Sequence, residues 1–148
     1  MLRRTMTAIA FLAAAVLPAV AAEVGEDGLH KEDWFAMTFR DIAEDIRSAS
    51  EQGKRLALVF EQRGCIYCAQ MHEKILSDPE VRDYIRENFM VVQYNMFGDE
   101  EVTDLDGEVL SEKTAARKWG FVFTPTIVFL PEQPVEGKTT AQAAVQVM

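Results

Sequence analysis

The chain has 148 residues, of which 49% are hydrophobic and 26% are charged, and this composition excludes collagen-like, mucin-like and disordered classes. Its length fits one globular domain. The 15 Lys and Arg residues against 24 Asp and Glu residues give a formal net charge of −9 without any basic block, so nucleic acid is not an expected partner. Two cysteines are too few for a disulfide-dense scaffold, which leaves both for chemistry.

The first 22 residues have the three-part pattern of a secretory signal peptide. A short cationic start at Arg3 and Arg4 precedes an apolar run over 8–20 and small residues at 21–22. The apolar run is shorter than the ~20 residues that cross a bilayer comfortably, so we expect cleavage and no stable membrane insertion, with an uncleaved anchor as the alternative. The pattern predicts export to the periplasm, an oxidising compartment.

The segment after the predicted cleavage point is polar. Residues 23–33 contain Gly and lack periodicity, so we expect a flexible lead-in to a domain over 34–148. Apolar side chains then recur at helical spacing from Phe39 to Ile46, and Gly53 is a stop signal. This pattern predicts the first helix.

Strands and helices alternate over the rest of the chain. A continuous apolar run bounded by charge is typical of a strand buried on both faces of a parallel sheet. The predicted elements are a strand at 56–60, helices at 68–75 and 79–88, a strand at 89–96, a solvated acidic excursion at 98–108, a helix at 111–119, and strands at 126–130 and 139–148. This order predicts an α/β fold with a mixed central sheet flanked by helices.

Two cysteines stand three residues apart where the first buried strand meets the next helix. Cys65 falls at the helix N-terminus, where unpaired N–H groups and the helix dipole stabilise a thiolate, and Arg63 adds a nearby cation. Cys68 lies one turn further in. The spacing therefore predicts a redox dithiol in which Cys65 attacks and Cys68 resolves the mixed disulfide.

Other interpretations of the two cysteines remain open. A purely structural disulfide closes so short a loop that it stabilises the fold little, and two inert buried thiols are a further alternative. A zinc site at Cys65, Cys68 and His72 lacks a fourth ligand. Haem attachment is excluded because Ala69, not His, follows the second cysteine. The redox pair is the leading interpretation, with no metal and no cofactor beyond the dithiol itself.

Three motifs resemble the thioredoxin-like superfamily: Arg-Gly-Cys-Ile-Tyr-Cys at 63–68, Trp-Gly at 119–120 and Thr-Pro-Thr-Ile-Val-Phe at 124–129. The resemblance covers residues 34–148. More narrowly, the motif before Cys65, the excursion after Asn95 and the Thr-Pro-Thr strand resemble periplasmic thioredoxins of the SoxW type, which occur with thiosulfate-oxidation systems.

The resemblance implies a thioredoxin fold with Cys65 as nucleophile and Cys68 as resolving residue. It also implies a cis peptide bond before Pro125 that faces the dithiol, with the Thr124 backbone pairing to an extended substrate. Substrate contacts are expected from both sides of the site: Gly64, Ile66, Tyr67, Thr124 and Pro125.

The sequence also departs from this family. Val59 stands where the family has a buried Asp that relays protons, and Glu61 is the nearby candidate for that role. His72 is expected to be an ordinary helix histidine outside the site. The family ends with a helix over one sheet face, whereas the predicted order here lacks that C-terminal helix, so we expect uncovered apolar side chains near the terminal hairpin.

These expectations combine into a functional hypothesis. The protein is expected to be an exported thiol-disulfide oxidoreductase that reduces disulfides of periplasmic proteins, such as those of sulfur oxidation. A membrane thiol electron donor would regenerate it. One alternative is a disulfide oxidant or isomerase, and another is a non-catalytic binding module with a vestigial dithiol.

Overall fold

A four-stranded sheet in the order β4-β3-β7-β8 is the centre of the fold in the computed structural model, which describes residues 23–148. Its strands are β3 (Arg55–Glu61), β4 (Phe89–Asn95), β7 (Thr126–Phe129) and β8 (Gln146–Val147). β3 pairs with β4 in parallel and with β7 antiparallel, which makes the sheet mixed, as predicted. The predicted signal peptide lies outside the described residues.

Strand β3 lies between two cores, which explains its continuous apolar run. Leu56, Leu58 and Phe60 point into the larger core, and Ala57 and Val59 point into the smaller one on the opposite face. Alternation of side chains along a strand produces this division. The strand therefore leads from the interior directly to the cysteine motif.

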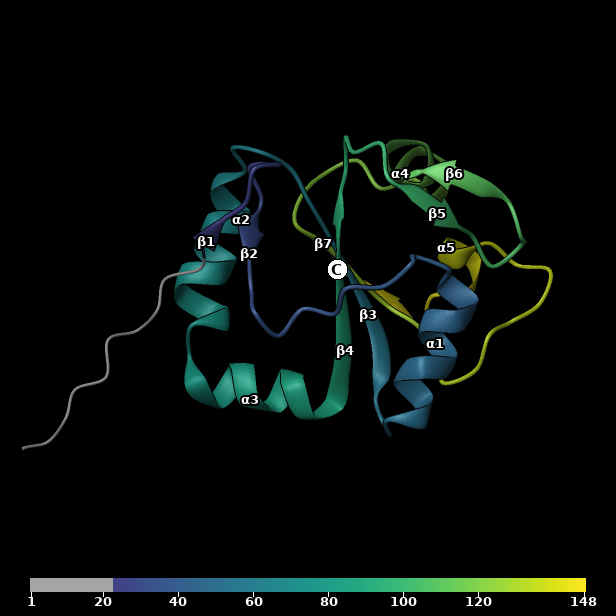
Figure 1. Cartoon of the computed structure of the whole chain (residues 1–148), viewed down its shortest axis with the longest axis horizontal. Coiled ribbons are helices and arrows are strands. Elements are labelled where there is room, and N and C mark those ends of the chain that lie inside the picture. Colours follow the sequence, from purple (N-terminus) through teal and green to yellow (C-terminus); the bar gives the residue numbers. More distant parts are fainter. Residues whose placement is uncertain (1–22) are drawn as a thin grey trace, which may run out of the picture.

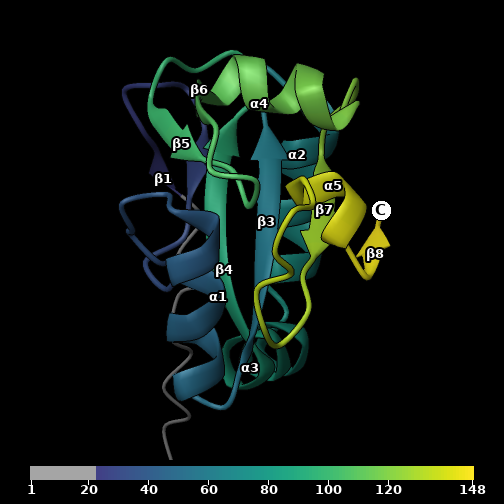
Figure 2. The same cartoon turned by 90° about the vertical axis from the view of Figure 1, so that its right-hand side faces the viewer.

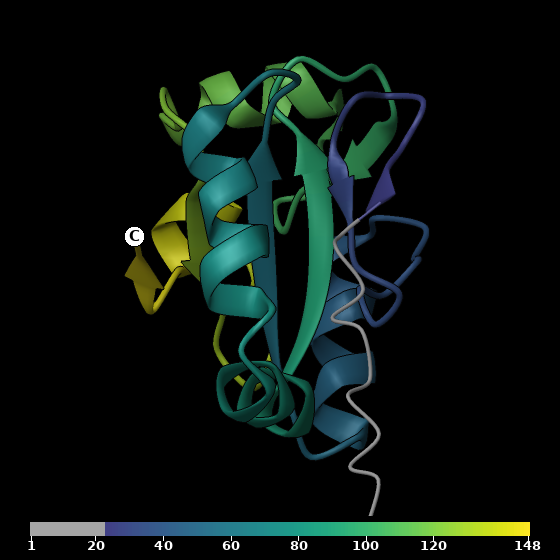
Figure 3. The same ribbon diagram turned by 90° about the vertical axis from the view of Figure 1, so that its left-hand side faces the viewer.

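Helices cover both faces of the sheet (Figure 1). On one face lie α1 (Ile42–Glu51), α4 (Glu112–Trp119) and the short α5 (Thr140–Ala143), and Figure 2 shows α4 at the upper end of the strands. On the other face lie α2 (Ile66–Gln70), its π-helical continuation η1 (Met71–Leu76) and α3 (Pro79–Asn88), as Figure 3 shows. This arrangement confirms the predicted fold class.

The first helix begins later than predicted. Asp41 caps α1 by accepting the N–H of Glu44 at 3.0 Å, so the helix starts at Ile42. Arg40 has a φ of 58°, and Phe39 is 98% exposed instead of contributing to the helix. Phe39 has helical spacing relative to the apolar residues of α1, but it lies outside the helix because the N-cap, Asp41, comes after it.

The expectation of a lead-in without regular structure at 23–33 is wrong. β1 (Glu23–Val24) and β2 (His30–Lys31) pair antiparallel, and Leu29 between them is only 2% exposed. This ribbon is held by one apolar anchor, a tight turn and hydrogen bonds from Gln93 and Arg63 to its backbone, and none of these produces a periodic pattern. We call residues 23–35 the N-terminal segment.

The acidic excursion is packed more tightly than the sequence indicates. β5 (Glu101–Thr103) and β6 (Val109–Ser111) form a hairpin. Asp104, just after β5, is 2% exposed and accepts hydrogen bonds from the Trp119 indole at 2.9 Å and the Thr140 backbone at 2.8 Å. Burial alone would raise the pKa of Asp104, but these bonds and the Lys118 ammonium hold it below its usual value.

The predicted strand over 139–148 is correct only at its end. Thr139 caps α5 in a capping box with Gln142, and only β8 pairs with β7, in antiparallel orientation. Val145 and Val147 are exposed here, where uncovered apolar side chains were predicted. A separate apolar groove of about 300 Å³ is lined by side chains of β3, β4, β7, η1 and α3 and by Trp34 and Phe35, and no residue of 139–148 lines it. Within residues 23–148, no helix is long and apolar enough to cross a membrane.

Candidate functional site

Cys65 and Cys68 form a disulfide at the start of α2, with their Cα atoms 5.2 Å apart. The chain leaves β3 at Glu61 and turns through Gly64, whose φ of 72° lies in the left-handed region that glycine adopts without strain. Cys65 is the N-cap of α2, and its Sγ accepts the backbone N–H of Cys68 at 3.0 Å. After reduction, this donor and the helix dipole would stabilise a Cys65 thiolate.

The two sulfurs differ in access to solvent. Cys65 is 7% exposed and Cys68 is 1% exposed, so Cys65 is the more accessible, although less open than a fully exposed helix start. Ile66 and Tyr67, which follow Cys65 directly, are 66% and 65% exposed. An incoming disulfide therefore meets Cys65 and these two side chains first.

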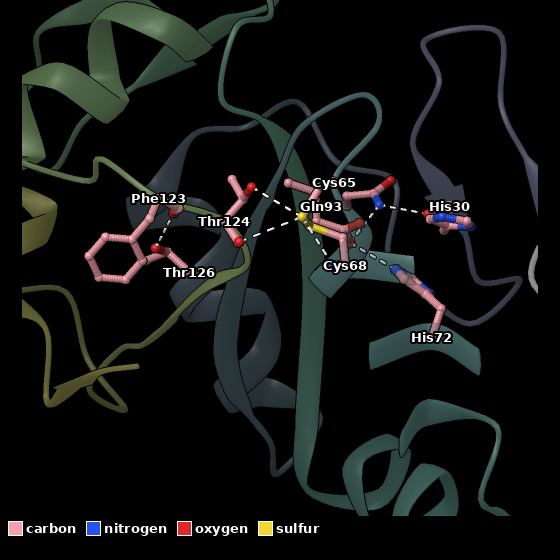
Figure 4. Close-up of a disulfide and its surroundings, with 9 residues drawn as sticks. His30, Cys65, Cys68, His72, Gln93, Phe123, Thr124 and Thr126 are labelled. Atoms are coloured by element: carbon pink, nitrogen blue, oxygen red, sulfur yellow. Dashed lines mark hydrogen bonds and ion pairs between the residues drawn. A yellow bond between two sulfur atoms is a disulfide. The ribbon is translucent and has the colours of Figure 1, made fainter. Parts of the chain in front are cut away.

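A loop distant in sequence faces Cys65 from the other side (Figure 4). The Thr124–Pro125 peptide is cis, as the resemblance implies, and the Thr124 carbonyl oxygen lies 3.5 Å from the Cys65 Sγ. The Thr124 hydroxyl donates a hydrogen bond to this sulfur at 3.3 Å. The hydroxyl of Thr126 holds the turn by donating to the Phe123 carbonyl at 2.7 Å.

Two apolar side chains that the sequence analysis did not select border this loop. Val122 and Phe123, which directly precede Thr124, are 78% and 66% exposed. Exposed apolar side chains that gather at one site mark interaction surfaces. The run Phe-Val-Phe after Gly120 was a signal that could have found them. We call Ile66, Tyr67, Val122 and Phe123 the apolar rim.

A buried polar cluster contains His72, which was predicted to be an ordinary helix histidine. Its Nδ1 lies 2.8 Å from a Glu32 oxygen and its Nε2 lies 2.9 Å from a Glu61 oxygen. Gln93 donates to the same Glu61 oxygen at 2.9 Å. Burial would lower the pKa of His72, but the hydrogen bonds and charges of Glu61 and Glu32 outweigh burial and raise it.

These contacts argue against the zinc interpretation. Both ring nitrogens of His72 are already bonded to carboxylates, and the sulfurs of Cys65 and Cys68 are bonded to each other. Within the described part of the chain, no group of three or more His, Cys, Asp and Glu side chains is arranged to hold a metal ion. The residues proposed as zinc ligands are thus engaged elsewhere.

Comparisons with known proteins agree with this geometry. A family model described as a thioredoxin-like domain matches residues 42–144. A thioredoxin-fold protein from Helicobacter pylori is 23% identical with a TM-score of 0.56, over 78% of this chain and 66% of that one. A thioredoxin from Thermus thermophilus is 26% identical with a TM-score of 0.52, over 73% of this chain and 71% of that one.

No curated protein matches the chain. The chain spans just under two thirds of the length of the Helicobacter pylori protein, so the similarity concerns the domain and not that whole protein. The family match nevertheless includes strands β3, β4 and β7 of the central sheet, the cysteine motif and the cis-proline loop. With most of its length matched and its fold in agreement, the chain belongs to the thioredoxin-like domain family.

Proposed function

We propose that this protein is a thiol-disulfide oxidoreductase whose Cys65 and Cys68 cycle between a disulfide and a dithiol. The observation that carries the proposal is the position of the Cys65 sulfur. It caps a helix N-terminus, accepts a hydrogen bond from the Thr124 hydroxyl and is the more accessible of the two sulfurs. These features favour a thiolate nucleophile at Cys65.

The chemistry proceeds by two thiol-disulfide exchanges. The Cys65 thiolate attacks one sulfur of a substrate disulfide, which forms a mixed disulfide and releases the other substrate sulfur as a thiolate. Cys68 then loses its proton and attacks the Cys65 sulfur, which restores the Cys65–Cys68 disulfide and releases the second substrate sulfur. Two electrons pass from the dithiol to the substrate, and the released thiolates take up protons from solvent.

The apolar rim and the cis-proline loop suggest how a protein substrate would lie. An extended segment could pair with the backbone at Thr124, since strand-like pairing supplies affinity independent of side chains. Ile66 and Tyr67 on one side and Val122 and Phe123 on the other would contact the residues next to the substrate cysteine. We therefore expect substrates in which apolar residues flank an accessible disulfide.

Insulin reduction tests the enzymatic proposal against the binding-module alternative. With dithiothreitol as electron donor, the wild-type protein should accelerate insulin precipitation, and Cys65→Ser should abolish the acceleration. Equal rates for the two proteins would leave no catalytic role for Cys65 and favour a vestigial dithiol. Far-ultraviolet circular dichroism of both proteins serves as the folding control.

The direction and location of the reaction form a finer part of the proposal. The signal-peptide pattern and the resemblance to SoxW-type thioredoxins support a periplasmic reductant of protein disulfides that a membrane thiol donor regenerates. The alternative is an oxidant or isomerase. A reduction potential near −270 mV supports the reductant, and one near −120 mV would support the oxidant.

A further inference from the structure

The buried cluster of Glu32, His72 and Glu61 lies behind the dithiol. Cys68 and His72 are four residues apart along α2 and η1, and each is only 1% exposed, so they occupy the same buried side of this helix. Gln93 and His72 share a Glu61 oxygen, and Figure 4 shows both residues on the other side of the disulfide from Thr124. Charge in the cluster therefore acts on Cys68 through the protein interior.

The cluster carries more negative than positive charge. Ionised carboxylates only accept hydrogen bonds, so an imidazolium at His72 satisfies both the Glu32 and the Glu61 contact. One imidazolium between two carboxylates leaves one negative charge. The ring of His30, whose centroid is 5.3 Å from that of His72, is the other titratable group that faces it, and Gln93 is neutral.

Within residues 23–148, His72 is the only basic side chain that pairs with Glu32 or Glu61. The second carboxylate oxygen of Glu61 is buried and lacks a hydrogen-bond partner within residues 23–148. Lys31 is the nearest cation of the N-terminal segment, but it is exposed and pairs with Asp27 at 2.6 Å, and it reaches only the Gln93 amide oxygen. A buried, incompletely compensated anion is costly, and its field extends further in the interior than in water.

We propose that the cluster of Glu32, His72 and Glu61 sets the reduction potential of the Cys65–Cys68 disulfide, with Glu32 as a positioning residue that acts through His72. Reduction adds two electrons and converts the uncharged disulfide into two thiols, of which Cys65 is the one that ionises to a thiolate. A nearby negative charge opposes the thiolate and so favours the disulfide. The cluster thereby makes the dithiol a stronger reductant, and this inference rests on the proposed oxidoreductase function.

The N-terminal segment holds Glu32 in place, although this segment precedes the family match at 42–144. The Gln93 amide donates to the His30 carbonyl at 2.7 Å. The Arg63 guanidinium, in the turn before Cys65, donates to the Glu26 carbonyl at 3.0 Å. Residues outside the matched domain thus contact both the active-site turn and the buried cluster.

Charge-neutral variants of the two carboxylates test the proposal. Gln can keep the acceptor for His72 while it removes the charge. We expect Glu61→Gln to shift the redox equilibrium with glutathione about tenfold toward the dithiol, which corresponds to about 30 mV, and Glu32→Gln to shift it roughly threefold in the same direction. Glu73→Gln is the matched control, because Glu73 is exposed on the same helix, and it should change the equilibrium less than Glu32→Gln.

One result would overturn the proposal, namely a Glu32→Gln shift no larger than that of Glu73→Gln. This comparison can be made even if Glu61→Gln fails to fold. The Glu32 side chain is 15% exposed and that of Glu61 only 1%, so replacement of Glu32 should destabilise the fold less.

Failure of the proposed function is distinguishable from failure of this inference. A protein that shows the expected shifts with glutathione but does not reduce insulin would contradict the enzymatic proposal and leave the redox role of the cluster intact. A protein that reduces insulin through Cys65 but shows equal potentials in Glu32→Gln and Glu73→Gln would support the enzymatic proposal and contradict the redox role of the cluster.

Discussion

Replacement of Leu29 by Ala should destabilise the whole domain. Leu29 is 2% exposed, and truncation of a buried Leu to Ala generally costs about 2–5 kcal/mol. The N-terminal segment can detach locally while the rest of the domain stays folded, which limits the loss of unfolding free energy. We therefore expect a loss of about 2–3 kcal/mol. With a urea m-value of about 1.5 kcal/mol/M, the unfolding midpoint should fall by roughly 1.3–2 M.

Urea unfolding followed by tryptophan fluorescence measures this change, because Trp34 and Trp119 lie in different parts of the domain. Val24→Ala is the matched control in the same ribbon, since Val24 is 56% exposed and its truncation should cost less than about 0.5 kcal/mol. If Leu29→Ala were as stable as Val24→Ala, the N-terminal segment would not be docked in solution, and its role near the dithiol would lose its basis.

Three further predictions concern the site and the core. In the reduced protein, iodoacetamide should label Cys65 faster than Cys68, and faster labelling of Cys68 would reverse their roles. Phe123→Ser should lower kcat/KM for insulin roughly fivefold, mainly through KM, whereas Val109→Ser, at an exposed position of β6, should leave it unchanged. Burial raises the pKa of Asp45 from 3.8 to about 6, so the folded state binds its proton more tightly. The unfolding free energy gained from this tighter proton binding is fully present below pH 3.8 and is lost as the pH rises through 6. Relative to Asp45→Asn, the wild-type protein should therefore lose up to about 3 kcal/mol of unfolding free energy between pH 4 and pH 7, and parallel pH profiles would refute the shift.

Local signals in the sequence were sufficient for most of the fold. The continuous apolar run of β3 predicts a strand buried on both faces, and the cores on its two sides explain it. Asp78 caps α3, Ser111 caps α4, and Gly120 ends α4 with a φ of 77°. Each of these features depends on residues within a few positions of one another, so the local sequence pattern is enough to predict them.

The features that the sequence did not predict depend on distant contacts. Leu29 is buried without any apolar periodicity around it. His72 became part of a buried cluster because Glu61 on β3 and Glu32 in the N-terminal segment reach it from 11 and 40 residues away. No spacing rule connects such residues, because tertiary packing brings them together. Asp104 and Thr140, 36 residues apart, are joined in the same way.

Capture of a mixed disulfide tests the central claim most directly. A Cys68→Ser variant lacks the resolving thiol, so a disulfide-linked peptide with apolar residues beside its cysteine should remain bound to Cys65 and appear as an adduct in intact-mass spectrometry. A Cys65→Ser variant should form little or no adduct under the same conditions. An adduct on Cys65→Ser as abundant as on Cys68→Ser, or no adduct on either, would contradict Cys65 as the nucleophile of a thiol-disulfide oxidoreductase.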